Sequence, residues 1–94
     1  MFDIERVAPD RVRLAGRLDA ARAPEADALF DTIDGPCLVD FTELRYISSA
    51  GLGVLLKTQK RLMDAGHALR LTGLSPHLGE IFRFAGFDRI FEIE

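Results

Sequence analysis

Helix-forming and strand-forming segments alternate along this chain, and that alternation limits its fold more than any other feature of the sequence. Apolar residues recur at helical spacing in three segments, and each segment is followed by a glycine suited to ending a helix. These segments run from Pro24 to Gly35, from Ser48 to Gly66 and from Ser75 to Gly86. Short apolar runs of strand character surround them, at residues 2–4, 12–18, 37–41, 68–71 and 90–93. The sequence therefore predicts an α/β fold, with a small mixed β-sheet covered by about three amphipathic helices.

The size and charge of the chain restrict its class. Its 94 residues suit a single domain, which we expect to span residues 1–94. The formal net charge is -3, so the chain lacks the basic surface that nucleic-acid binding requires. The single cysteine, Cys37, excludes an internal disulfide and a cysteine-based zinc site. We expect it to be a buried, reduced thiol.

Neither a signal sequence nor a membrane span is evident. The first seven residues include Asp3, Glu5 and Arg6, which interrupt any apolar signal core. No stretch approaches the roughly 20 apolar residues that cross a membrane. We therefore expect a cytoplasmic protein without membrane insertion.

The start of the second helical segment is the most informative part of the chain. Two adjacent hydroxyls, those of Ser48 and Ser49, are followed by three residues of minimal bulk, Ala50, Gly51 and Gly53. Unpaired N–H groups and the helix dipole make such a start favourable for an anion. One hydroxyl is enough to cap a helix, and a cap is the simplest interpretation of either serine. The second hydroxyl, on a turn without bulky neighbours, makes Ser49 a candidate modification site.

Enzymatic chemistry finds little support in the sequence. The run Gly51–Gly53 begins a dinucleotide-binding fingerprint, but Leu56 occupies the position of its third glycine. A serine hydrolase that uses Ser49 would lack the first glycine of its nucleophile elbow, where Ile47 stands. The chain has two histidines, and their spacing is not that of metal ligands. We therefore expect no enzymatic activity, no cofactor and no metal site.

Five segments carry a resemblance to a known family. They are Leu14–Asp19, Leu38–Phe41, Tyr46–Leu55, Leu71–Pro76 and Phe84–Phe91. Through runs such as L-A-G-R-L-D and Y-I-S-S-A-G-L-G-V-L, the chain resembles the bacterial anti-sigma factor antagonists of the STAS domain superfamily. The resemblance covers nearly the whole chain and implies a STAS-like fold.

The resemblance also implies a function and a set of site residues. In that family, a serine at the position of Ser49 is phosphorylated by a partner kinase that is also an anti-sigma factor. The unphosphorylated chain would bind this ATP-dependent serine kinase and free a sigma factor, and a metal-dependent serine phosphatase would restore it after phosphorylation. The expected partner-binding residues are Asp19, Ser48, Ser49, Ala50, Gly51, Leu52 and Gly53. Asp19 is equally well interpreted as a turn residue, and Leu52 as a core residue.

Two positions depart from the family pattern. Ser48 stands where the family often has aspartate, and Ala50 stands where a second serine or threonine is common. The missing carboxylate beside Ser49 leaves a second hypothesis open. In that hypothesis the chain is a constitutive STAS scaffold or interaction subunit of a transporter or of another signalling complex.

Overall fold

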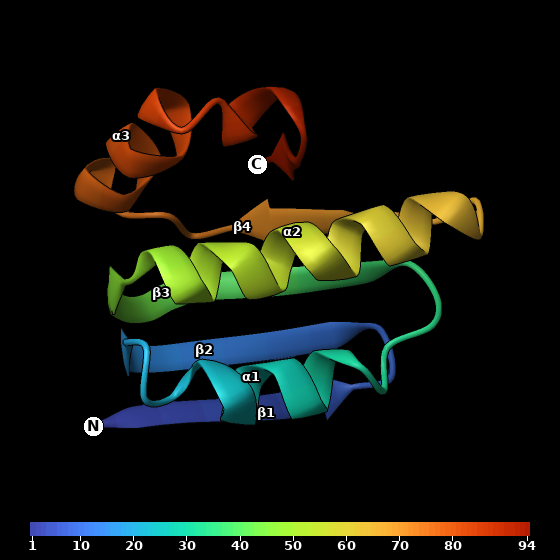
Figure 1. Ribbon diagram of the computed structural model, residues 1–94, viewed down its shortest axis with the longest axis horizontal. Helices are drawn as coiled ribbons and strands as arrows, with labels where there is room; N and C mark the ends of the chain where they lie inside the picture. The colour runs from blue at the N-terminus through green and yellow to red at the C-terminus, as the bar shows by residue number, and fades with distance from the viewer.

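The chain folds into a five-stranded sheet with helices packed against it, as a computed structural model of residues 1–94 shows (Figure 1). The elements in chain order are β1 (Phe2–Ala8), β2 (Arg11–Leu18), α1 (Ala23–Phe30), β3 (Cys37–Ile47), α2 (Ser49–Asp64), β4 (Leu69–Thr72), α3 (Pro76–Phe84), the 3-10 helix η1 (Phe87–Arg89) and β5 (Glu92–Ile93). The predicted α/β fold with a small mixed sheet and three α-helices is confirmed.

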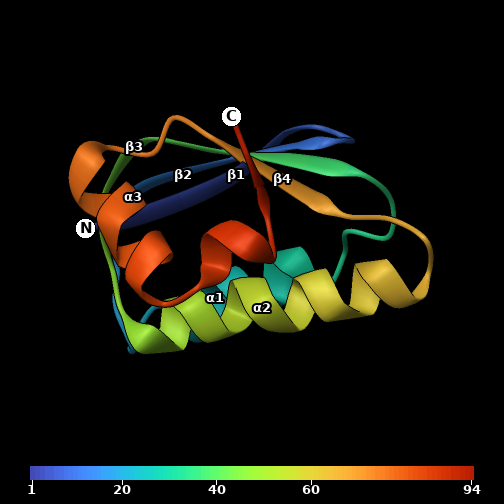
Figure 2. The ribbon, with the colours of Figure 1, turned by 90° about the horizontal axis from the view of Figure 1, so that it is seen from above.

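The sheet has the strand order β1-β2-β3-β4-β5. β1 and β2 form an antiparallel hairpin, whereas each later strand pairs in parallel with the one before it. Parallel neighbours require a crossover connection, and α1, α2 and α3 supply the three that this sheet needs. α1 and α2 lie on the same face of the sheet (Figure 2). The carboxyl ends of β2, β3 and β4 therefore meet along one edge, where the helices begin.

Buried side chains between the sheet and the helices form one core of 21 residues. Phe82 of α3 is fully buried, and its ring meets Phe41, Phe87 and Phe91 at centroid distances of 5.7, 5.9 and 6.3 Å. Edge-to-face pairs of this kind contribute about 0.5–1.5 kcal/mol beyond area burial. This cluster holds α3, η1 and β5 against the sheet. Cys37 is a free, buried thiol, as predicted, and burial raises its pKa.

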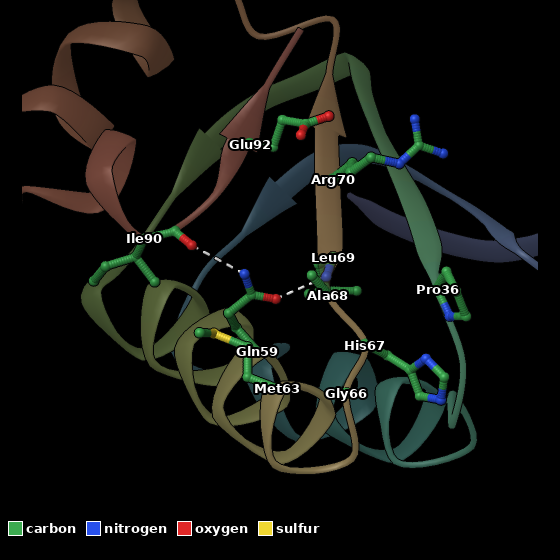
Figure 3. A pocket seen from close by; sticks show the side chains of 10 residues that line it. All are labelled: Pro36, Gln59, Met63, Gly66, His67, Ala68, Leu69, Arg70, Ile90 and Glu92. Atoms are coloured by element: carbon green, nitrogen blue, oxygen red, sulfur yellow. Dashed lines mark hydrogen bonds between the residues drawn. The ribbon is translucent and has the colours of Figure 1, made fainter.

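The polar side chains inside the core are hydrogen-bonded. The Thr58 hydroxyl donates to the Val54 carbonyl over 2.9 Å. Gln59 is 2% exposed; its Oε1 accepts from the Leu69 N–H over 2.7 Å and its Nε2 donates to the Ile90 carbonyl over 3.0 Å (Figure 3). The Gln59 side-chain amide therefore takes the place of a peptide group between β4 and the segment that leads into β5.

The outer face of the sheet is charged. The Arg13 guanidinium lies 2.7 Å from a carboxylate oxygen of Asp3, 3.2 Å from Glu5 and 3.2 Å from Glu43. The hydrogen bonds that Arg13 donates to the carboxylates of Asp3 and Glu5 raise its pKa, so this residue is cationic throughout the accessible pH range. Charges of opposite sign thus face one another across β1, β2 and β3, an arrangement that supports the strand register.

The first helix is shorter than the glycine pattern predicts. α1 ends at Phe30 rather than near Gly35, and Gly35 does not have a positive φ. The reason is Arg61 of α2, whose Nη2 donates to the carbonyls of Phe30 and Ile33 over 2.9 and 2.7 Å. A side chain thus satisfies carbonyl groups at the helix end, so no glycine cap is needed. The glycines after α2 and α3 do adopt positive φ values, 83° and 76°, as predicted.

Candidate functional site

The candidate site lies where β2 and β3 end at the same edge of the sheet. Leu18 and Ile47 are register partners there, and the Ser48 N–H donates to the Leu18 carbonyl over 2.9 Å. Asp19 directly follows the end of β2, and α2 directly follows Ser48. The fold therefore brings together two segments that are about thirty residues apart in the sequence and that both belong to the predicted site.

The two adjacent serines differ in their surroundings. Ser48 is the N-cap of α2: its backbone is extended, and its Oγ accepts from the Gly51 N–H over 3.2 Å. Ser48 is partly buried, whereas Ser49 is exposed at the first helical position and its hydroxyl makes no hydrogen bond within the chain. The cap therefore uses one hydroxyl, and the hydroxyl of Ser49 is left free at the surface.

The glycines of the first turn also differ. Gly51 is buried, and a Cβ atom there would lie 2.8 Å from Cγ of Leu18 and 2.9 Å from Cγ1 of Ile47. Gly53 is exposed, and a Cβ atom there would meet nothing within 4 Å. Gly51 therefore allows α2 to pack closely on the ends of β2 and β3, and Gly53 leaves the outer side of the helix flat.

The remaining predicted residues lie around this turn. Ala50 is exposed, and Leu52 is partly buried and packs against the core. Asp19 is partly buried, and its Oδ1 accepts from the Arg22 N–H over 3.0 Å. Asp19 therefore shapes the turn that leads into α1, although it also lies beside Ser48 at the sheet edge. Ser49, Ala50 and Gly53 form the exposed part of the predicted set, which we call the α2 start surface.

A cation–aromatic pair that the sequence reasoning missed lies at the same edge. The guanidinium carbon of Arg17 is 4.2 Å from the ring centroid of Tyr46, its register partner on β3. β3 carries one extra residue here, because Gly16 pairs with Leu44 and Arg17 pairs with Tyr46. Arg45 is that extra residue of the bulge. The pairing depends on this shift in register, and no sequence pattern marks it.

The structure contains no group of three or more His, Cys, Asp or Glu side chains that could hold a metal ion. None of its helices has the length and apolar composition that a membrane span needs. A surface hollow lined by Gln59, Met63 and Ile90 lies toward the far end of α2 from Ser49 (Figure 3). The predicted site is therefore a surface at the start of α2 and has no enclosed cavity.

Comparison with known proteins finds STAS domain relatives along nearly the whole chain. The family model described as "Mlab, STAS domain" matches residues 3–92. An anti-sigma-B factor antagonist of Listeria monocytogenes is 38% identical over 85 residues, which are 86% of this chain and 75% of that protein. The putative anti-sigma factor antagonist BtrV of Bordetella bronchiseptica is 36% identical over 84 residues, 85% of this chain and 72% of that protein.

Solved structures agree with the fold. The anti-sigma factor antagonist SpoIIAA in its unphosphorylated form superposes with a TM-score of 0.80 at 22% identity, covering 100% of this chain and 88% of that one. The Bacillus cell fate determinant SpoIIAA in the phosphorylated form gives a TM-score of 0.73 at 22% identity, covering 100% and 91%. At this identity the likeness concerns the fold alone. Together with the family model and the curated relatives, it shows that the chain belongs to the STAS domain family.

Proposed function

We propose that this chain is an anti-sigma factor antagonist whose binding to an anti-sigma factor serine kinase is switched off by phosphorylation of Ser49. The observation that carries the proposal is the division of roles between Ser48, whose partly buried hydroxyl caps α2, and Ser49, whose hydroxyl is exposed and makes no hydrogen bond within the chain. The names of the relatives from Listeria and Bordetella support the role of antagonist. On this basis the chain is a regulatory binding protein and not an enzyme.

The α2 start surface suits the approach of another protein. Ala50 and Gly53 place little bulk beside Ser49, so a kinase active site can reach the hydroxyl without displacing a large side chain. Asp19 and Leu52 lie next to this surface and would form its border. A partner bound here would cover the Ser49 hydroxyl, which is the group that the modification changes.

Phosphorylation transfers one phosphoryl group to Ser49. The kinase holds ATP; the bond between the γ-phosphorus and its bridging oxygen breaks, a bond to Oγ of Ser49 forms, ADP leaves, and the hydroxyl proton passes to a base of the kinase. A metal-dependent serine phosphatase would reverse the change by hydrolysis, with water attacking phosphorus and inorganic phosphate leaving. The catalytic groups and the metal belong to these partners.

The phosphate acts as a switch through its charge. It adds about −1.5 to −2 charges at the surface that the partner covers. The N-terminus of α2 tolerates this charge within the domain, because the helix dipole favours an anion there. A docked partner would have to desolvate the charge, which costs several kcal/mol without a compensating cation. The complex therefore dissociates without any large rearrangement of the fold.

Affinity capture from native lysate tests the proposal, with the wild-type chain, Ser49→Ala and Ser49→Asp as baits. We expect the wild type and Ser49→Ala to capture an ATPase of the histidine-kinase type, and Ser49→Asp to lose it. Gly35→Asp is the matched control, because it adds the same carboxylate beyond the opposite end of β3, where a new Cβ atom would meet nothing within 4 Å. Incubation of the captured kinase with ATP should phosphorylate the wild type and leave Ser49→Ala unmodified.

The constitutive scaffold hypothesis predicts a different result from the same baits. The feature that favours it is Ser48, which stands where the family pattern often has a carboxylate beside the acceptor. Identical partners on the wild-type and Ser49→Asp baits would support the scaffold, and Ser49 would then be a surface residue of a helix start.

A further inference from the structure

The charges along the outer face of the sheet are not evenly compensated. Three of its arginines lie in ion pairs: Arg11 with Asp40, Arg13 with three carboxylates of β1 and β3, and Arg70 with Glu94. Arg17 and Arg45 differ, because neither makes an ion pair or a side-chain hydrogen bond. Both are exposed, in a chain whose net charge is -3. Two arginines without an acidic partner therefore lie near the same end of β2 and β3.

The Arg17 guanidinium is held in place although it has no acidic partner. It stacks on Tyr46 with 4.2 Å between its carbon and the ring centroid. A guanidinium that lies over an aromatic face keeps its N–H groups in its own plane, directed outward, where they can receive a carboxylate. The stacking also reduces the side-chain freedom that a binding partner would otherwise have to remove.

The position of this pair connects it to the α2 start surface. Arg17 and Tyr46 each directly precede a residue of the Leu18–Ile47 pair, and Ser48 donates to the Leu18 carbonyl at the same edge. Arginine and tyrosine are also the residue types that most often dominate binding energy in protein interfaces.

We infer that Arg17, Tyr46 and Arg45 form a second contact of the same partner interface and receive an acidic segment of the anti-sigma factor kinase. The inference rests on the proposed function, since it names the chemistry of that partner beside Ser49. Charge complementarity identifies the occupant: two free guanidinium groups fit a carboxylate-bearing surface, and they repel a basic one. Because this contact lies outside the helix turn that carries Ser49, we infer that it determines which kinase this chain recognises.

Titration calorimetry with the kinase captured by the wild-type chain, purified and loaded with ADP, tests the inference. We expect Arg17→Gln and Tyr46→Leu each to weaken binding about tenfold. We also expect Arg17→Gln to reduce the dependence of the affinity on salt. The matched control is Arg70→Gln, which removes an arginine that already has a carboxylate partner and should change the affinity less than about twofold. Circular dichroism and thermal unfolding verify that each variant is folded.

A crosslinking experiment identifies the kinase segment that contacts this site. Arg45 is replaced by the photoreactive residue p-benzoylphenylalanine, and the kinase peptide that it captures is sequenced. An acidic peptide supports the inference, and a basic or wholly apolar peptide overturns it.

The outcomes separate this inference from the proposed function. If the wild type and Arg17→Gln bind the kinase with equal affinity and equal salt dependence, the inference is overturned. If Ser49→Asp abolishes kinase binding in the same experiments, the proposed function still holds. If the wild type captures no kinase at all, the proposed function fails and the inference fails with it.

Discussion

Alanine substitutions at Gly51 and Gly53 test how the first turn of α2 is packed, because the two glycines are chemically identical and differ only in their surroundings. At Gly53 the new methyl group meets nothing within 4 Å, so the gain in helix propensity is realised. That gain is at most about 1 kcal/mol. At Gly51 the methyl group would lie under 3 Å from buried carbons of Leu18 and Ile47, neither of which is a free side-chain end.

The two substitutions should therefore have opposite effects on stability. Overpacking of a filled core costs about 1–3 kcal/mol, which exceeds the propensity gain at Gly51. We expect Gly51→Ala to lower the free energy of unfolding by about 1 kcal/mol and Gly53→Ala to raise it by up to about 1 kcal/mol. The difference of about 2 kcal/mol corresponds to about 8–16 °C in melting temperature for a domain of this size.

Thermal and urea unfolding, followed by circular dichroism, measure this difference, with each variant serving as the control for the other. If Gly51→Ala proves as stable as Gly53→Ala, the close packing of α2 on the ends of β2 and β3 is incorrect. Partner binding gives a second readout. Gly53→Gln leaves the fold intact but adds bulk beside Ser49, so we expect it to weaken kinase capture under the proposed function.

Three further predictions concern other contacts. Ser48→Ala removes the cap of α2 and should cost about 1 kcal/mol of stability by urea unfolding, and Ser48→Asp should retain it. Gln59→Leu leaves the Leu69 N–H and the Ile90 carbonyl without their hydrogen-bond partner, and we expect the free energy of unfolding to fall by about 2–4 kcal/mol in the same assay. A smaller loss would refute the bridging role of Gln59. Hydrogen bonds that Thr42 donates lower the pKa of Asp40 in the folded protein. Ionised Asp40 therefore stabilises the fold fully at pH values above its pKa in the unfolded chain, which is near 4. This contribution is lost as the pH falls through the lower pKa of the folded protein. An acid titration of Asp40→Asn should therefore show a shallower loss of stability below about pH 4 than the wild type.

Much of the fold could be predicted because local signals agreed with the packing. Apolar spacing defined the order of elements, and the Ser75–Pro76 pair marked the start of α3, where the Ser75 hydroxyl does accept from the Leu78 N–H. The end of α1 could not be predicted, because it depends on Arg61, which lies 31 residues from Phe30 in the sequence and contacts it only after α1 and α2 pack together.

The sequence predicted that the named residues lie together at the start of α2, but it predicted only partly what each of them contacts. Two adjacent serines at a helix start indicate a cap, but only the structure assigns the cap to Ser48 and leaves Ser49 free. The difference between Gly51 and Gly53 likewise depends on what lies opposite each residue across the chain. The Arg17–Tyr46 stack was missed, because it requires a one-residue bulge in β3 that hydrophobic alternation does not encode.

The bridge made by Gln59 has a consequence for experiments on this molecule. The amide proton of Leu69 belongs to a strand, yet its acceptor is a side chain of α2 and not a neighbouring strand. Its rate of exchange with solvent deuterium therefore depends on how stably α2 packs against the sheet, because the hydrogen bond breaks when the helix separates from β4. One resonance in an NMR spectrum would thus report, from the far end of α2, whether an event at Ser49 loosens the helix or leaves it in place.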